Sequence, residues 1–274
     1  MKKILLATAA VIGMAIPAAA ETIIAVGQEG RGYEAFGKKM VERLNGKLPA
    51  SIENYEGSDA ISRAVCDGAA QVGIMQIDAI YARQKEGCSL RVVGTYGTEY
   101  AYMLVPPGSS IDELHDLAAG NKILVDTVGS GTDLFWNTIV SIETGPNGNK
   151  SGWSQATSIN DPVFLAPSMA DLGEIDAVLI VGTTKSKDVK ELIDAGWELA
   201  AIDDKDINDE VFNGSSLYPR EDAEIDGTGG WLSGNASNTS YAIRSFVVVG
   251  SELAADRRAF ADVAQAAKAV ATEK

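Results

Sequence analysis

The sequence predicts an α/β fold arranged in two lobes. Short runs of β-branched and other apolar residues alternate along the chain with stretches whose apolar residues recur at helical spacing. The strand runs are almost continuously apolar rather than alternating, which is typical of strands covered on both faces. A stiff turn, Pro106 to Ser110, follows one strand directly, and we expect the second lobe to begin there.

In the first part of the chain, each expected strand is followed by an expected helix. Phe36, Met40 and Leu44 fall on one face of a helical stretch that begins at Tyr33. Ser58 is placed to cap a further helix, which Gly68 ends. The expected elements are strands at 22–26 and 72–75 and helices at 33–44, 58–67 and 79–84.

The later part of the chain continues the alternation but contains two long polar segments. Residues 203–219 and 226–240 are poorly periodic, and we expect loops there. We assign 21–105 and about 206–274 to lobe I and 106–205 to lobe II. The expected elements are strands at 102–105, 122–125, 175–181 and 245–249 and helices at 111–117, at 132–142 and from 251 onward.

The first twenty residues have the pattern of a secretory signal peptide. Lys2 and Lys3 precede an uncharged, mostly apolar run, and small residues up to Ala20 precede Glu21. The run, Ile4 to Ile16, has about 13 residues, short of the roughly 20 that a membrane-spanning helix needs. We therefore expect cleavage after Ala20 and a protein that works in the periplasm.

Charge disfavours two classes of partner. The formal net charge is −15, and losing Lys2 and Lys3 would make it −17. No run of basic residues remains to neutralise phosphates, so binding of nucleic acid or a membrane surface is disfavoured.

The two cysteines, Cys66 and Cys88, suggest a disulfide, because an even count in an oxidising compartment favours pairing. Such a bridge would stabilise the fold by about 3 kcal/mol. Two buried free thiols are the alternative, since cysteine is also an ordinary core residue.

Two glycine-rich loops each lie between an expected strand and an expected helix. The first, Gly27 to Tyr33, has the order GxxGxG and would aim backbone N–H groups at an anion at the helix N-terminus. A tight turn without ligand explains that motif equally well. The second, Val128 to Thr132, could face the first across a cleft, although capping of the helix by Ser130 or Thr132 is an equal alternative.

Gln76 and Asp78 follow the strand at 72–75, where open α/β sheets bind ligands. Capping of the next helix is a slightly better explanation for Asp78.

No catalytic centre can be assembled from the sequence. The only histidine, His115, lies among acidic residues in a short amphipathic stretch and is most simply a solvated helix residue. The acidic runs at 203–206 and 209–210 have the pattern of a solvated face. A calcium site in these loops remains an alternative, although the EF-hand spacing is absent. We assign no catalytic residue, metal or cofactor.

Several segments together resemble the TAXI-type solute receptors of TRAP transporters. The most specific is Asp67 to Asp78, with the pattern DGxAxxGIxQxD, and VGSGTDLFW from Val128 and DLGEIDAVLIVG from Asp171 follow in the same order. The resemblance implies a type II periplasmic binding protein with two α/β lobes that close on a small organic anion, such as an amino acid or a dicarboxylate. It implies delivery of the solute to a membrane permease and, by position, the ligand-facing residues Gly30, Arg31, Tyr33, Gln76, Asp78, Gly129, Ser130, Gly131 and Thr132, with Thr183 and Thr184 as weaker candidates.

The first loop departs from the family pattern, which is richer in serine and threonine. Arg31 in that loop could form a bidentate pair with a ligand carboxylate, or only a surface salt bridge with Glu29 or Glu34. Two alternative functions remain. In the first, the protein is a binding protein for an ABC permease or a sensor kinase; in the second, it is an exported hydrolase. We expect a monomeric receptor rather than an enzyme.

Overall fold

The computed structural model describes residues 21–229 and 234–273, so the expected signal peptide lies outside the described residues. The strands are β1 Thr22–Val26, β2 Ala50–Asn54, β3 Val72–Gln76, β4 Arg91–Val105, β5 Lys122–Leu124, β6 Thr157–Ile159, β7 Ala177–Gly182, β8 Glu198–Ala200, β9 Val211–Phe212, β10 Ser215–Ser216, β11 Arg220–Glu224 and β12 Ser237–Val249. The α-helices are α1 Gly32–Leu44, α2 Ser58–Cys66, α3 Ile77–Lys85, α4 Gly131–Glu143, α5 Ala166–Asp171, α6 Lys187–Asp194, α7 Lys205–Asp209, α8 Ser251–Ala255 and α9 Arg257–Ala271.

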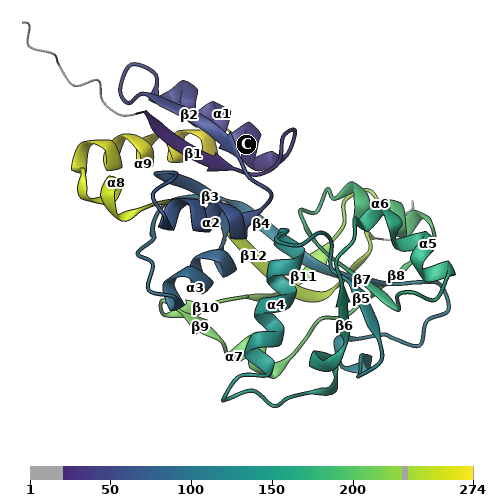
Figure 1. Ribbon diagram of the computed structural model, residues 1–274. Helices are drawn as coiled ribbons and strands as arrows, with labels where there is room; N and C mark the ends of the chain where they lie inside the picture. Colours follow the sequence, from purple (N-terminus) through teal and green to yellow (C-terminus); the bar gives the residue numbers. More distant parts are fainter. Residues whose placement is uncertain (1–20, 230–233, 274) are drawn as a thin grey trace, which may run out of the picture.

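One mixed sheet runs through the described chain, in the order β2-β1-β3-β12-β4-β7-β5-β6. The outer strands pair in parallel on each side, β2-β1-β3 at one end and β7-β5-β6 at the other. Between them, β4 and β12 pair antiparallel with each other over most of their length. Figure 1 shows these two long strands crossing from the group around β1 to the group around β5. They therefore join the two lobes.

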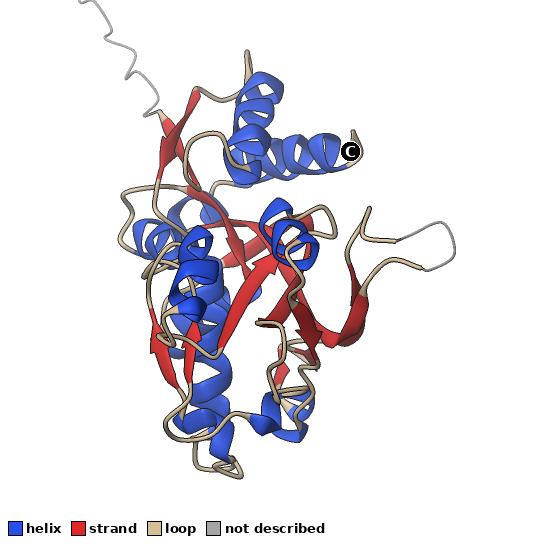
Figure 2. Ribbon diagram, turned by 90° about the vertical axis from the view of Figure 1, so that its right-hand side faces the viewer, coloured by secondary structure: helices blue, strands red, loops and turns tan. Residues whose placement is uncertain are grey.

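Helices cover both faces of the strands, as the continuous apolar strand runs predicted (Figure 2). One core packs α1 and α9 onto β1, β3 and β12 and contains Met40, Leu44 and Val263. A second packs α6 against β4 and β7 and contains Val189. The largest core combines residues of α2 and α3 with residues of α4, Phe135 among them. The two lobes are thus packed against each other on that side.

The expected strands and most expected helices are confirmed, with shifted boundaries. The strand expected at 102–105 is the end of a strand that begins at Arg91, and the one expected at 245–249 begins at Ser237. The glycines and polar residues within these strands hid their length, because apolar runs mark only the buried parts. The C-terminal helix is divided at Asp256, whose carboxylate accepts the N–H groups of Arg258 and Ala259 at 2.9 and 3.1 Å.

The helix expected at 111–117 is wrong. Only a single 3₁₀ turn forms, Leu114–Asp116, and Leu114 N–H donates to Ala201 O at 2.8 Å instead of bonding within a helix. The buried residues Ile111, Leu114 and Leu117 recur every three positions, the period of a 3₁₀ helix rather than an α-helix.

The long loop expected at 203–219 contains regular structure. Asp204 caps the short helix α7, and β9 and β10 form a hairpin with Asn213 and Gly214 at the turn, both at positive φ. These elements are too short for periodicity to reveal. Asp204 is only 4% exposed, so the solvated face expected for this acidic run is wrong at that residue.

The predicted disulfide is present between Cys66, the last residue of α2, and Cys88, just after α3. Their Cα atoms are 5.8 Å apart, within the usual range. The bridge ties together the ends of two helices that pack on β3 and β12.

Candidate functional site

Five polar side chains meet where β3 ends beside the two long strands. Gln76 is the last residue of β3, and its register partner on β12 is Ser245. Glu99 comes from β4, Tyr33 from the first turn of α1, and Ser58 from the start of α2. We call these five residues the central cluster.

Glu99 is the acceptor at the middle of the cluster. Its Oε2 accepts hydrogen bonds from Ser245 Oγ at 3.1 Å and from Tyr33 Oη at 3.2 Å. The amide of Gln76 donates to the same oxygen from Nε2 at 3.3 Å. Burial raises the pKa of Tyr33 well above its usual value, and the charge of Glu99 raises it further. The phenol therefore stays protonated and available as a donor.

Gln76 carries an unsatisfied acceptor. The residue is 3% exposed, and its backbone N–H donates to Ser58 Oγ at 3.2 Å. Its side-chain Oε1 is buried and has no hydrogen-bond partner among the residues that the structure describes. Because leaving a buried acceptor unpaired costs about 1–3 kcal/mol, the site is one hydrogen-bond donor short.

The N-termini of α2 and α4 approach each other beside Gln76. A Cβ on Gly57, which precedes α2, would lie 2.2 Å from the carbonyl oxygen of Gly129. A Cβ on Gly131, the first residue of α4, would lie 2.4 Å from Gln76 Nε2. At Gly57 only glycine permits the contact, because the atom it meets belongs to the backbone, whereas a side chain at 131 would displace the amide of Gln76. The contacts bring one loop from each lobe together.

Backbone N–H groups at both helix starts are available for an anion. The amides of 58–60 and of 131–132 donate to no other residue within the described ranges. Free amides at a helix N-terminus, reinforced by the helix dipole, favour a carboxylate or another anion. Two such ends converge here.

The hydroxyl groups of the second loop have structural partners. Ser130 caps α4 by accepting Asp133 N–H at 3.1 Å, and Gly129 N–H donates to the Asp133 carboxylate at 2.8 Å. Thr132 is buried and its Oγ1 accepts Val181 N–H at 2.9 Å. Capping, the alternative that the sequence left open, accounts for the Ser130 hydroxyl, whereas the Thr132 hydroxyl binds β7 instead. The backbone amides of Gly131 and Thr132 remain free among the described residues.

Ser58 does not cap α2, contrary to expectation. The residue before the helix is Gly57, which offers no side chain, and the hydroxyl of Ser58 turns instead to Gln76 N–H.

In the first loop, Arg31 stays exposed and forms no ion pair among the described residues. Glu34 binds Lys38 at 2.8 Å and accepts Gly30 N–H at 2.8 Å, so the surface pair with Arg31 is not formed. Arg31 is instead close enough to Asp126, which belongs to the other lobe, for its charge to act on that carboxylate. Burial raises the pKa of Asp126, and the positive charge of Arg31 partly offsets that rise.

Neither Asp78 nor Thr183 forms a hydrogen bond with the described residues of the central cluster. Asp78 is fully buried, and its carboxylate accepts Tyr218 Oη at 3.1 Å and Ala79 N–H at 2.9 Å. Burial raises its pKa to about 7. Thr183 is exposed just after β7, where its hydroxyl accepts Lys185 N–H at 3.3 Å, and Thr184 donates to Asp226 at 3.1 Å.

Sequence reasoning missed Glu99 and Ser245. Glu99 lies in the part of β4 that the strand expected at 102–105 left out, whereas Ser245 is the first residue of the strand expected at 245–249. Isolated polar residues in a strand give no local signal of what they face, and only the pairing of β12 with β3 places Ser245 beside Gln76.

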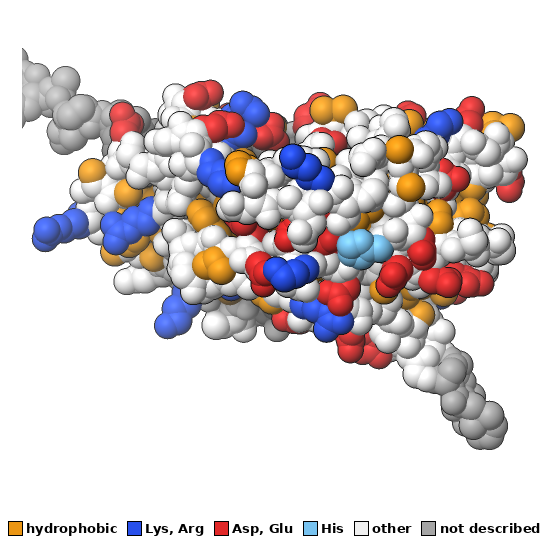
Figure 3. Space-filling view, turned by 90° about the horizontal axis from the view of Figure 1, so that it is seen from below, with side chains coloured by type: hydrophobic (Ala, Val, Ile, Leu, Met, Phe, Trp, Pro, Cys, Tyr) orange, Lys and Arg blue, Asp and Glu red, His pale blue; other side chains and the backbone are white. Residues whose placement is uncertain are grey.

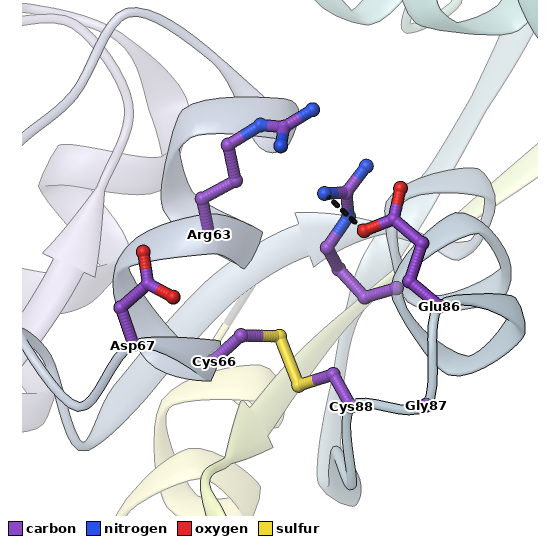
Figure 4. A pocket seen from close by; sticks show the side chains of 7 residues that line it. Arg63, Cys66, Asp67, Glu86, Gly87 and Cys88 are labelled. Carbon is purple, nitrogen blue, oxygen red and sulfur yellow. Dashed lines mark ion pairs between the residues drawn. A yellow bond between two sulfur atoms is a disulfide. The ribbon is translucent and has the colours of Figure 1, made fainter.

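A surface depression of about 350 Å³ lies elsewhere, beside the disulfide (Figure 4). Arg83 lines it, ion-paired with Glu86 at 2.7 Å and with Asp59 at 3.3 Å. The arginine charge is thus already compensated, and the central cluster is the better site for a solute.

Solved structures share this architecture. The alkanesulfonate-binding protein SsuA from Xanthomonas axonopodis pv. citri, bound to MOPS, matches with a TM-score of 0.53 and 15% identity over 93% of this chain and 72% of that one. The periplasmic aliphatic sulphonate-binding protein SsuA from Escherichia coli matches with a TM-score of 0.51 and 14% identity over 93% and 75%. The substrate-binding protein of an amino acid ABC transporter matches with a TM-score of 0.50 and 12% identity over 93% and 94%.

The chain has the two-lobed fold of periplasmic binding proteins. At these identities the likeness concerns the fold alone. No protein-family model and no curated protein matches this sequence. None of the helices in the described part of the chain combines the length and hydrophobicity needed to cross a bilayer.

Proposed function

We propose that this protein is a periplasmic solute-binding receptor that captures a small organic anion between its lobes and delivers it to a TRAP-type permease. The observation that carries the proposal is the meeting of two helix N-termini with free amides beside the unpaired Gln76 Oε1. These groups are polar, lie between two lobes and have no partner of their own. A solute that fills the site would satisfy them and hold the lobes together.

The central cluster favours an amino acid over a dicarboxylate. The converging amides suit a carboxylate, whereas Glu99 places a negative charge beside them. An α-ammonium group would pair with Glu99 and supply the donor that Gln76 Oε1 lacks. A second carboxylate in that position would be repelled.

The TAXI-type resemblance supports the TRAP permease as the partner, and the ligand-facing set of glycines, Arg31, Tyr33 and Gln76 follows from it. An ABC permease is the competing partner, since a binding protein of an amino acid ABC transporter shares the fold. No covalent step is needed in either case. Affinity would come from hydrogen bonds and the exclusion of water as the lobes close.

The proposal is tested by identifying the solute. Mass spectrometry of molecules released when the purified protein is denatured should detect an α-amino acid. A thermal-shift screen should then find stabilisation by amino acids and little by their N-acetylated forms, which lack the ammonium group. Failure of every amino acid and carboxylate to raise the melting temperature would refute a receptor for this class of solute.

Glu99→Gln isolates the role proposed for the carboxylate. We expect at least a tenfold loss of amino acid affinity by calorimetry, because the ion pair is removed while the side-chain shape is kept. Glu42→Gln, at an exposed position of α1, is the matched control and should bind as wild type does. Unchanged affinity in Glu99→Gln would instead leave the dicarboxylate class as the better assignment. Uptake assays with membranes containing TRAP-type or ABC-type subunits distinguish the partners.

A further inference from the structure

Three carboxylates meet far from the central cluster, at the opposite end of α4. Glu143 is the last residue of α4, and Asp204 and Asp206 lie at the start of α7. Each offers one oxygen, and these three oxygens all lie within 4.8 Å of one another. Glu143 is 0% exposed and Asp204 is 4% exposed, so this is not a solvated acidic surface. We call the three residues the acidic triad.

One carboxylate oxygen of the triad, on Glu143, lacks a hydrogen-bond partner in the described chain. The other Glu143 oxygen accepts the N–H of Ser151, while Oε2 is buried without a hydrogen-bond partner among the described residues. A buried carboxylate oxygen is normally hydrogen-bonded, paired with a charge or bound to a metal. Its position in the last turn of α4 adds to the cost, because the helix dipole disfavours negative charge there.

The two aspartates are held in place by the surrounding chain. Asp204 Oδ1 accepts Asp206 N–H at 2.8 Å and Ile207 N–H at 3.2 Å, and Oδ2 accepts the Trp153 indole N–H at 3.1 Å. Asp206 accepts the backbone N–H of Asn149 at 2.6 Å and its side-chain amide at 3.0 Å. Because each carboxylate oxygen has two lone pairs, both aspartates retain acceptor capacity.

Little positive charge faces the triad. His115 Nε2 lies 3.2 Å from Asp204 Oδ2, on a side chain that is 42% exposed. Figure 3 shows the face of the molecule on which this histidine is exposed, with acidic side chains nearby. The neighbouring Lys205 binds Asp209 at 2.7 Å, and no lysine or arginine in the described chain forms an ion pair with the triad. Among the described residues, His115 is therefore the only basic side chain within ion-pair distance of the triad, although the charge of Lys205 acts on Asp204 and Asp206 from further away.

We propose that Glu143, Asp204 and Asp206 form a binding site for a divalent cation of the calcium class. The ligands are oxygens only, which suits a hard cation. Two oxygens bound to one Ca²⁺ at about 2.4 Å each can be at most about 4.8 Å apart, and the triad meets this limit. The smaller Mg²⁺, with bonds of about 2.1 Å, has a stricter limit of about 4.2 Å between two bound oxygens and demands near-octahedral geometry, so the more adaptable Ca²⁺ is the better match. Water completes the coordination.

The cation has a structural role in this arrangement. It ties the end of α4 to α7 and to the 144–151 connection that carries Asn149 and Ser151. The central cluster lies at the other end of α4, about 18 Å away along a helix of this length. The site is thus independent of the solute and of the proposed receptor function.

Terbium provides a direct probe, because the Trp153 indole is hydrogen-bonded to a triad carboxylate. With chelator-treated full-length protein, we expect Tb³⁺ emission on excitation of tryptophan and its displacement by Ca²⁺. Trp153→Phe should weaken the emission, with Trp136 left as the nearby donor because its ring centroid lies 5.8 Å from that of Trp153, and should leave stabilisation by Ca²⁺ intact. At roughly 100 times its dissociation constant, Ca²⁺ should raise the melting temperature of the wild type by about 5–10 °C.

Glu143→Gln removes one charge with little change of shape, and Asp206→Asn does the same at a less buried position. Both variants should need at least ten times more Ca²⁺ than the wild type for the same rise in melting temperature. In EDTA, without Ca²⁺, Glu143→Gln should be more stable than the wild type. Asp209→Asn, on the exposed side of α7, is the matched control and should respond as wild type does. The proposal is overturned if about 10 mM Ca²⁺ leaves the melting temperature unchanged and no sensitised emission occurs, or if both triad variants bind as wild type does.

Discussion

Gly57 and Gly129 touch across the two lobes. A Cβ on Gly57 would lie 2.2 Å from the carbonyl oxygen of Gly129, closer than any real Cβ contact. The contact joins the loop before α2 to the loop before α4, and it is where the free helix amides converge. Gly57 itself has an extended backbone, so the absence of a side chain rather than an unusual φ is what the position requires.

Gly57→Ala should hold the lobes apart. The methyl group meets a backbone atom, which cannot swing away as the end of a flexible side chain can. We expect a loss of stability of about 1–3 kcal/mol and at least a tenfold loss of solute affinity, with a larger radius of gyration by X-ray scattering. Gly234→Ala, where a Cβ meets nothing within 4 Å, is the control. Unchanged scattering and affinity would show that the closed contact is not needed.

Arg31→Ala should weaken binding of a solute carboxylate by at least tenfold, or about 1.4 kcal/mol, when measured by calorimetry. Arg31 is exposed, has no ion-pair partner among the described residues, and its charge acts on Asp126 of the opposite lobe. Arg258→Ala, at an exposed position in α9, removes the same charge elsewhere. If Arg31→Ala stays within about twofold of wild type, the guanidinium does not bind the solute.

Asp78 should make stability fall as the pH rises. Burial raises its folded-state pKa to about 7, whereas an unfolded aspartate titrates near 3.9. Between these values the folded state holds a proton that the unfolded state has lost, so the stabilisation is complete below about pH 4 and is lost by about pH 7.

Urea unfolding of the wild type and Asp78→Asn measures this effect. The two should be similar in stability near pH 4, and the variant should be more stable above about pH 7, by up to about 4 kcal/mol. The difference between the two proteins includes the effect of Glu99, whose charge also raises the pKa of Asp78 and has no carboxylate at position 78 to act on in the variant. A stability difference that does not change with pH would contradict the assignment.

Replacing both Cys66 and Cys88 by serine should lower stability by about 3 kcal/mol, because the bridge restricts a loop of 22 residues in the unfolded chain. For a chain of this size the melting temperature should fall by roughly 6–12 °C. Reduction of the wild type should lower it similarly. Solute affinity should change little, since the bridge lies at the ends of α2 and α3 that point away from Gln76. A melting temperature unaffected by reduction would count against a stabilising bridge.

Much of the fold could be predicted because its local patterns are strong. The helix predicted at 33–44 and the strand predicted at 72–75 match the structure almost to the residue. The helix is marked by apolar residues at helical spacing, and the strand by an unbroken apolar run that is buried on both faces. The 3₁₀ turn at Leu114 and the hairpin around Asn213 could not be found this way. Their form depends on backbone pairing with distant residues such as Ala201, or extends over too few residues to show a period.

The residues of the two sites likewise fall into those that the sequence predicts and those that only the tertiary structure brings together. Glycine-rich loops, the strand end at Gln76 and the cysteine pair are visible in the sequence, because each is a local pattern with a backbone or redox reason. The meeting of Glu99 and Ser245 with Gln76, and that of Glu143 with Asp204 and Asp206, comes only from folding. Sheet register brings Gln76 to Glu99 over 23 positions and Glu99 to Ser245 over 146 positions, and helix packing brings Glu143 to Asp204. These long-range contacts leave no periodic trace in the chain.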